Sequence, residues 1–299
     1  MAGSGGGGET TTVAVDGGDL LVGAWGPKDA PVVVAAHGIT GNHLHFAFVA
    51  RALASDHRVL APDLRGRGNS AAVGGPYGMA AHARDLLAVL DDAGADRAVL
   101  VGHSMGAFVA VAMAAAYPDR VARAVLVDGG LPLGTEVVAG EDIDATLDRV
   151  IGPAVQRLAM TFASHGAYHE FWKAHPAIGG DWTDELRAAV DYDLMGEPPK
   201  LRSGVSADAV RGDGADNVDD GRVLPAADRS ACSLRLLWAE RGMLGQSPGL
   251  YTAATVARFR ARFGARFDDE RVHGVNHYTI ALSERGAVRI AAAVRDDRA

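Results

Sequence analysis

The sequence predicts an α/β fold, in which a mostly parallel, doubly wound sheet carries an inserted helical segment. Short apolar runs alternate with helical patterns through the first 130 residues, which is typical of parallel strands joined by right-handed crossovers. One of these runs passes through a glycine-framed serine directly into a helical pattern. The alternation stops at Leu131 and resumes near Leu234. We therefore expect a core of residues 10–130 and 229–299, with a helical cap of residues 131–228.

Composition and charge restrict the class of protein further. The chain is 48% hydrophobic and 22% charged, as in ordinary globular proteins. Its formal net charge of −8 and its lack of a basic cluster argue against a nucleic-acid partner. The single cysteine, Cys232, excludes an intramolecular disulfide and a cysteine-based metal site. No run reaches the roughly 18 apolar residues of a membrane helix, so no membrane partner is expected.

The first nine residues are rich in glycine and lack the basic and apolar regions of a signal peptide. We expect residues 1–9 to form a disordered tail and the protein to be cytoplasmic. No exposed apolar stripe stands out, which leaves a homodimer open.

The core elements follow in order. Residues 11–15 and 20–25, joined at Asp16-Gly17-Gly18-Asp19, predict a β-hairpin. The continuous apolar run 31–36 is typical of a strand that is buried on both faces of a parallel sheet. The other core elements expected from the same patterns are strands at 57–62, 98–101, 121–127, 234–239 and 266–272, and helices at 45–54, 78–93, 107–116, 251–263 and 278–294.

The cap is helical in pattern, most clearly at 144–160, 167–175 and 183–194, and contains no convincing buried strand. Its later part, 197–221, is polar and rich in glycine and aspartate. Four of its aromatic residues are candidate substrate contacts, although they could instead form the cap's own core: Phe162, Trp172, Trp182 and Tyr192.

The serine turn has the pattern of a nucleophile elbow. Gly102-His103-Ser104-Met105-Gly106 is a G-x-S-x-G sequence between a strand and a helix. The glycines permit close backbone approach, so that Ser104 can stand exposed at the strand end. The following helix presents unsatisfied N–H groups to a developing oxyanion. The pattern therefore favours a nucleophilic serine over a glycine-rich turn that contains a serine by chance.

With these motifs in order, the chain resembles the α/β-hydrolase superfamily over nearly its whole length. The matching pieces are His37-Gly38, the loop from Asp63 to Ser70, the Ser104 turn and His277 before the last helix. The resemblance implies that Ser104 is the nucleophile and His277 its general base, with an oxyanion hole formed by the N–H groups of Ile39 and Met105. His273 competes for the histidine role.

Two further residues of the core, Gly38 and His103, are expected to contact the substrate beside the oxyanion region. His103 is also expected to support the neighbouring loops. The chemistry requires no metal or organic cofactor, and the partner expected is a small-molecule substrate.

The acidic residue that would pair with the catalytic histidine departs from the family pattern. Gly242 stands where the family commonly places an aspartate after the seventh strand. Asp128, at the end of the sixth strand, is favoured because some branches place the acid there, including lactonases that resemble zearalenone hydrolase. Glu240 is the alternative. Either carboxylate could instead be structural: Asp128 bonded to the turn amides of Gly129 and Gly130, and Glu240 in a local ion pair.

A serine nucleophile favours acyl transfer, and we expect hydrolysis of a carboxylic ester or lactone of a mostly apolar substrate. Two alternatives remain open. The first is a carbon–carbon bond hydrolase that acts on diketones with the same residues. The second is a ligand-binding module on a hydrolase scaffold.

Overall fold

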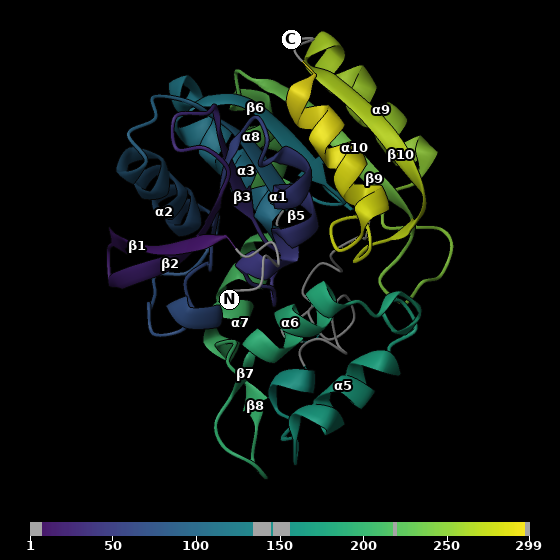
Figure 1. The fold of residues 1–299 in the computed structure, drawn as a ribbon. Coiled ribbons are helices and arrows are strands. Elements are labelled where there is room, and N and C mark those ends of the chain that lie inside the picture. The colour runs from purple at the N-terminus through teal and green to yellow at the C-terminus, as the bar shows by residue number, and fades with distance from the viewer. Residues whose placement is uncertain (1–7, 134–144, 146–155, 218–219, 297–299) are drawn as a thin grey trace.

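The computed structural model describes residues 8–133, 145, 156–217 and 220–296. Its centre is an eight-stranded sheet in the order β1-β2-β4-β3-β5-β6-β9-β10 (Figure 1). β1 pairs antiparallel with β2, and β2 with β4, while every other neighbouring pair is parallel. The bounds of its strands are β1 Glu9–Val15, β2 Gly18–Trp25, β3 Val32–Ala36, β4 Arg58–Pro62, β5 Ala98–His103, β6 Val121–Val127, β9 Ser233–Arg241 and β10 Phe267–Asn276. The expected doubly wound α/β fold is confirmed.

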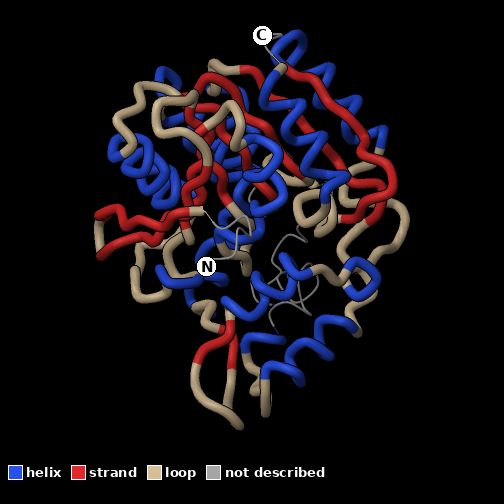
Figure 2. Tube along the Cα trace, in the orientation of Figure 1, coloured by secondary structure: helices blue, strands red, loops and turns tan. Residues whose placement is uncertain are grey.

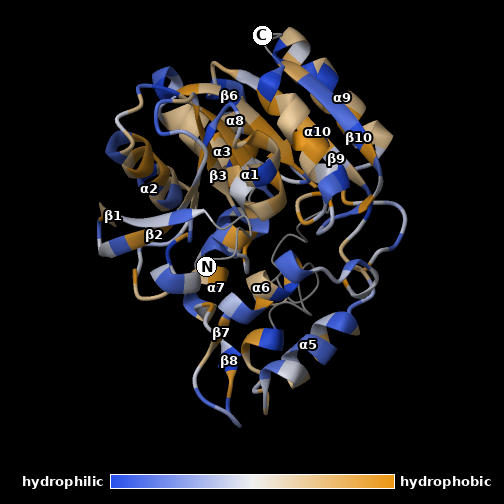
Figure 3. Cartoon of the chain, in the orientation of Figure 1, coloured by the Kyte–Doolittle hydropathy of each residue, from blue (hydrophilic) through white to orange (hydrophobic). Residues whose placement is uncertain are grey.

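Helices cover both faces of this sheet (Figure 2). One apolar cluster joins the sheet to α1 and α10, and the other joins it to α2, α3 and α9. The bounds of these helices are α1 Ala47–Leu53, α2 Met79–Asp92, α3 Met105–Ala116, α9 Ala253–Phe263 and α10 Glu284–Arg295. α3 lies in the middle of its layer and is apolar along its whole length (Figure 3). A helix surrounded by apolar neighbours needs no polar face.

The cap elements lie between β6 and β9 and extend beyond one end of the sheet (Figure 1). Their bounds are α5 His165–Lys173, α6 Asp184–Tyr192, β7 Leu194–Met195, β8 Arg202–Ser203, α7 Ala207–Asn217 and α8 Asp220–Arg229. The cap has its own apolar cluster, which includes Phe162, Tyr168 and Leu186 and also Leu282 of the core.

Several elements differ from the sequence-based expectations. The closing helix begins at Glu284 rather than near residue 278, because Ser283 caps it by accepting from the amide of Gly286 at 3.3 Å. β7 and β8 pair over only two residues each, too few to leave an apolar pattern in the sequence. α7 forms within the polar stretch 197–221. β1 begins at Glu9, the last residue of the segment expected to form the tail. Most of the expected helix at 144–160 lies outside the described residues.

Among the residues that the structure describes, no helix combines the length and apolar character needed to cross a membrane.

Candidate active site

Ser104 stands in a sharp turn between β5 and α3. Its φ of 55° and ψ of −120° lie in a region that non-glycine residues rarely occupy. Its backbone N–H donates to the Val127 carbonyl at 2.9 Å, which ties the turn to β6. A Cβ on Gly106 would collide with the Ala36 carbonyl, so α3 can approach β3 this closely only with glycine at that position. The flanking glycines thus permit a strained serine that is half-buried at the end of the strand.

His277 and Asp128 lie in line with the Ser104 hydroxyl. His277 follows β10 directly, and its Nε2 lies 3.1 Å from Ser104 Oγ. Its Nδ1 lies 2.7 Å from Asp128 Oδ2. A carboxylate oxygen can only accept here, so Nδ1 carries the proton and Nε2 is free to accept the proton of the serine hydroxyl. The structure therefore brings together Ser104, His277 and Asp128.

Asp128 is held by backbone on both sides. It directly follows β6 in a second strained turn, with a φ of 47°. Its amide donates to the Leu237 carbonyl at 2.8 Å, and its Oδ1 accepts from the Ala239 amide at 2.9 Å. The carboxylate is fully buried, so these partners and His277 fix its orientation. Its hydrogen bonds go to β9 and His277, not to the turn amides of Gly129 and Gly130.

Glu240 lies elsewhere. It sits near the end of β9, where it accepts from the Gly274 amide at 2.8 Å and lies 3.6 Å from Arg271. His273 is 3.5 Å from the same carboxylate and is exposed, so neither of these two residues reaches Ser104 through a described hydrogen bond. The hydrogen bond from the Gly274 amide is the main cause that lowers the pKa of the Glu240 carboxyl below its usual value.

The loop after β3 lies over Ser104, since a Cβ on Gly38 would come 3.3 Å from the Ser104 Cβ. His37 holds this loop: its Nε2 accepts from the Leu64 amide at 3.0 Å, so its Nδ1 must donate to the Gly38 carbonyl at 2.8 Å. Burial lowers the pKa of His37 to about 3, which keeps the ring neutral, as both hydrogen bonds require. Ile39 lies in this loop, and Met105 opens α3, where its N–H has no acceptor within the helix.

His103 supports the histidine from behind. Its Nε2 lies 2.7 Å from the His277 backbone carbonyl, which can only accept, and the two rings lie 5.0 Å apart between centroids. Burial lowers the pKa of His103 well below its usual value. Its side chain is 3% exposed, so the neutral ring buttresses His277.

The four cap aromatics occupy different surroundings. Phe162 is buried in the cap cluster, 4.7 Å from the Tyr168 ring between centroids. Tyr192 donates its hydroxyl to Asp63 Oδ2 at 2.6 Å, so it joins the cap to the loop after β4. Trp182 lies beside Lys173, whose Nζ is 5.7 Å from the ring centroid. Trp172 lines a small cavity with Tyr278, the neighbour of His277.

That cavity, of about 30 Å³, also borders Thr40 of the loop after β3 and the buried Arg157. Arg157 donates to Tyr168 at 2.6 Å and forms a buried ion pair with Asp193. Burial, opposed by Arg157, raises the pKa of Tyr278 to about 12, so its hydroxyl keeps its proton. Sequence reasoning did not single out Arg157 or Asp193, because lone charged residues in helical patterns normally face solvent.

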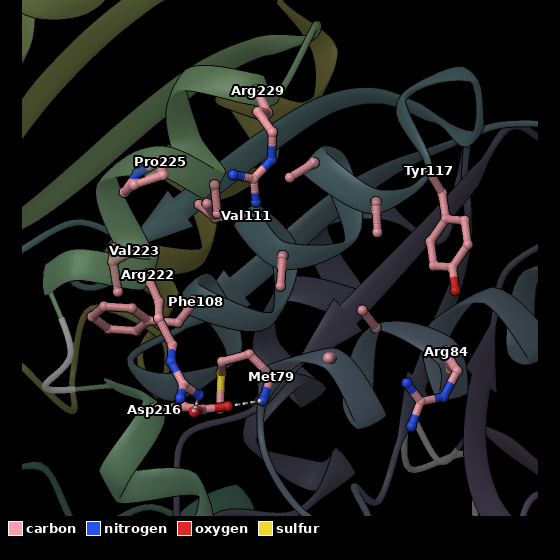
Figure 4. A pocket seen from close by; sticks show the side chains of 16 residues that line it. Met79, Arg84, Phe108, Val111, Tyr117, Asp216, Arg222, Val223, Pro225 and Arg229 are labelled. Atoms are coloured by element: carbon pink, nitrogen blue, oxygen red, sulfur yellow. Dashed lines mark hydrogen bonds and ion pairs between the residues drawn. The ribbon is translucent and has the colours of Figure 1, made fainter.

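A larger groove of about 590 Å³ lies away from Ser104, between α2, α3 and α8 (Figure 4). Its floor is apolar, with Phe108 and Val111 of α3, and Arg84, Arg222 and Arg229 stand around its rim. Arg222 pairs with Asp216. None of the three aligned residues Ser104, His277 and Asp128 lines this groove.

Comparisons with known proteins agree with this fold. A family model described as the alpha/beta hydrolase fold matches residues 31–163. Over 129 residues, the chain is 37% identical to a bifunctional esterase/perhydrolase of Acinetobacter calcoaceticus, covering 42% of this chain and 47% of the relative. It is 38% identical to the lipase LipV of Mycobacterium tuberculosis, covering 43% and 48%. The chain thus spans less than half the length of these curated relatives.

Among solved structures, the chain is similar to E-2-(acetamidomethylene)succinate hydrolase. The TM-score is 0.76 at 24% identity, covering 96% of this chain and 99% of that one. At this level of identity the likeness establishes the fold.

Proposed function

The chain belongs to the α/β-hydrolase superfamily, and on that premise we propose that it is a serine hydrolase that cleaves a carboxylic ester or lactone. The observation that carries the proposal is the hydrogen-bonded series from Asp128 through His277 to Ser104. A serine hydroxyl is a weak nucleophile until an adjacent base can take its proton. The 3.1 Å distance from His277 Nε2 to Ser104 Oγ supports that role, because Nδ1 donates to Asp128 and leaves Nε2 as the acceptor.

The reaction proceeds in two acyl transfers. Ser104 Oγ attacks the substrate carbonyl as its proton passes to His277 Nε2, and Asp128 stabilises the resulting imidazolium. The N–H groups of Ile39 and Met105 stabilise the tetrahedral oxyanion. Its collapse breaks the ester bond, and the leaving alkoxide takes the proton from His277. Water, deprotonated by His277, then attacks the acyl-enzyme. The bond between the acyl carbon and Ser104 Oγ breaks, Oγ takes the proton back from His277, and the acid is released.

The apolar side chains near His277 support a mostly apolar substrate. Tyr278, which follows His277, borders a small cavity with Trp172, Ile178 and Leu186 of the cap, and a minority of its lining residues are polar or charged, among them Arg157 and Asp193. Apolar pockets with a few convergent polar groups are the usual form of small-molecule sites. The relatives named as esterase and lipase agree with ester chemistry.

The first test is labelling with a fluorophosphonate, detected as an increase in the mass of the intact protein. We expect wild type to gain one phosphonyl group and Ser104→Ala to gain none. The same pair is then assayed on a panel of esters and lactones. Equal turnover by wild type and Ser104→Ala would reject the proposal.

The panel also separates the alternatives. Conversion of a vinylogous diketone into carboxylate and ketone fragments, without ester turnover, would identify a carbon–carbon bond hydrolase. Saturable binding without labelling or product would instead identify a ligand-binding module.

A further inference from the structure

Arg67 is a fully buried arginine that lies behind the oxyanion loop. Its Nε donates to the Ile39 carbonyl at 2.9 Å, and its Nη1 donates to the Arg65 carbonyl at 2.9 Å. Its Nη2 lies 3.8 Å from the sulfur of Met105. One guanidinium thus contacts both residues whose N–H groups are assigned to the oxyanion hole.

The charge of Arg67 is balanced from the cap. Asp213 lies in the middle of α7, is fully buried, and forms an ion pair with Arg67 Nη1. It also lies 3.0 Å from His82 Nε2 and accepts from the Gly78 amide at 2.6 Å, at the start of α2. Burial raises the pKa of this carboxyl, but His82, Arg67 and the Gly78 amide outweigh it and hold the pKa at about 2. Asp213 is therefore ionised at neutral pH.

The two peptide planes that meet at Ile39 are held from two sides. The plane that contains the Ile39 N–H also contains the Gly38 carbonyl, to which His37 Nδ1 donates at 2.8 Å. The next plane contains the Ile39 carbonyl, to which Arg67 Nε donates at 2.9 Å, so loss of either bond frees Ile39 to turn its N–H. Arg67 can hold that carbonyl only while its own planar guanidinium is fixed, which the bond to Asp213 does. A shift of the oxyanion donors by about 1 Å is enough to slow an acyl transfer by about 100-fold.

From this geometry we propose that Arg67 and Asp213 are positioning residues that hold the Ile39 N–H over Ser104, and that α7 of the cap thereby sets the oxyanion hole. The proposal rests on the proposed function, because it assigns a task to that same hole. It predicts that loosening α7 at Asp213 impairs the chemical step while substrate binding is retained.

The test compares Arg67→Lys and Asp213→Asn with Asp216→Asn. Lysine keeps the charge opposite Asp213 but lacks the planar fork that also reaches Ile39. Asp213→Asn keeps the shape of the side chain and an oxygen that can accept from the Gly78 amide, but it removes the negative charge opposite Arg67. Asp216 is a matched control on the same helix, since it accepts from the Met79 amide at 3.0 Å and pairs with Arg222 without contacting Arg67.

With 4-nitrophenyl butyrate as substrate, we expect Arg67→Lys and Asp213→Asn to lower kcat by about 10- to 100-fold, with KM changed by less than about twofold. A trifluoromethyl ketone forms an adduct with serine that carries an oxyanion. Its inhibition constant should rise in both variants by about the same factor as kcat falls. Inhibition by the corresponding alcohol should not change. Asp216→Asn should leave all of these values unchanged.

Amide hydrogen exchange supplies a readout that does not depend on activity. The amides of residues 39–41 should exchange faster in both positioning variants than in wild type or Asp216→Asn, while those of α3 stay protected. Unchanged exchange in these amides, or an unchanged kcat in either folded variant, would overturn the proposal. If Ser104→Ala hydrolyses the ester like wild type, the proposed function fails, and the exchange experiment alone decides whether the residues hold the loop.

Discussion

The sheet and the cap are stabilised by different kinds of interaction. The two clusters that pack against the sheet consist of apolar residues, many of them fully buried on β3, β5, β6 and α3. Among its described residues, the cap has a small apolar cluster of its own and also contributes Val205, Val210 and Val223 to one of the sheet clusters. It contains buried charges as well. Asp193 binds Arg157, Tyr168 and Ser203 within the cap, and Asp213 binds Arg67 and His82 across its contact with the core.

This difference shows where each region is vulnerable. Apolar packing depends on shape, whereas a buried ion pair fails when one partner is removed or neutralised. The aligned Ser104, His277 and Asp128 all stand at ends of core strands. The loop after β3, which carries Ile39, also receives support from the cap, because Asp213 of α7 pairs with Arg67 behind it. In the mechanism that we propose, the core would supply Ser104, His277 and Asp128, and the cap would help to hold the Ile39 N–H.

The largest effect is expected from the core. Asp128→Asn keeps the shape of the side chain but removes the acceptor that fixes the His277 tautomer, so kcat/KM should fall by about 10³- to 10⁴-fold. Glu240→Gln is the matched control at the end of the neighbouring strand and should change kcat/KM by less than about twofold, because its partners are Gly274 and Arg271. Ester hydrolysis by the two variants measures the difference. A large loss in Glu240→Gln with little loss in Asp128→Asn would assign the acid to β9.

A smaller effect is expected in the cap. Arg157→Met leaves the buried Asp193 carboxylate without its charged partner and should lower the free energy of unfolding by about 3–5 kcal/mol. Glu170→Gln breaks the exposed pair with Lys173 and should cost less than about 1 kcal/mol. Urea unfolding measures both values. Pairing Arg157→Met with Asp193→Leu should recover part of the loss, and no recovery would mean that Arg157 acts through its packing against Trp172.

The smallest expected effect is the change in the free energy of unfolding per unit of pH. Acid titration should affect the two regions over different ranges of pH. His37 is neutral in the folded core, with a pKa lowered by burial from 6.5 to about 3. Below about pH 6.5 the unfolded chain therefore binds a proton on His37 that the folded chain does not bind. The free energy of unfolding consequently falls by about 1.4 kcal/mol per pH unit as pH decreases from 6.5 toward 3. The Asp213 contribution is present above its unfolded pKa of 3.8 and is lost only as pH falls toward 2.

Urea unfolding at a series of pH values tests this order. His37→Gln can retain a donor and an acceptor without titrating, so its stability should depend less steeply on pH between 6.5 and 4 than that of wild type. Asp213→Asn should keep the wild-type slope in that window and lose the steep fall below pH 3.8. Identical slopes for wild type and His37→Gln would show that the ring is not held neutral.

Local sequence patterns were sufficient for most of the core. The apolar run of β3 and the hairpin of β1 and β2 are each encoded in neighbouring residues, because strand burial and turn chemistry act over short distances. The cap was less predictable. α7 forms in a polar, glycine-containing stretch, where intrinsic helix propensity is weak and contacts with the core must supply the stability.

The sequence by itself determined the fold class, the strained serine turn and the set of candidate groups, since each depends on a short pattern of residue types. Only the tertiary structure decided which carboxylate faces His277, because Asp128 and Glu240 end neighbouring strands and a difference of one strand position is not visible in spacing. It also decided that Arg67 and Asp213, 146 residues apart, form one buried pair. Such contacts arise from packing between distant segments, and no local pattern records them.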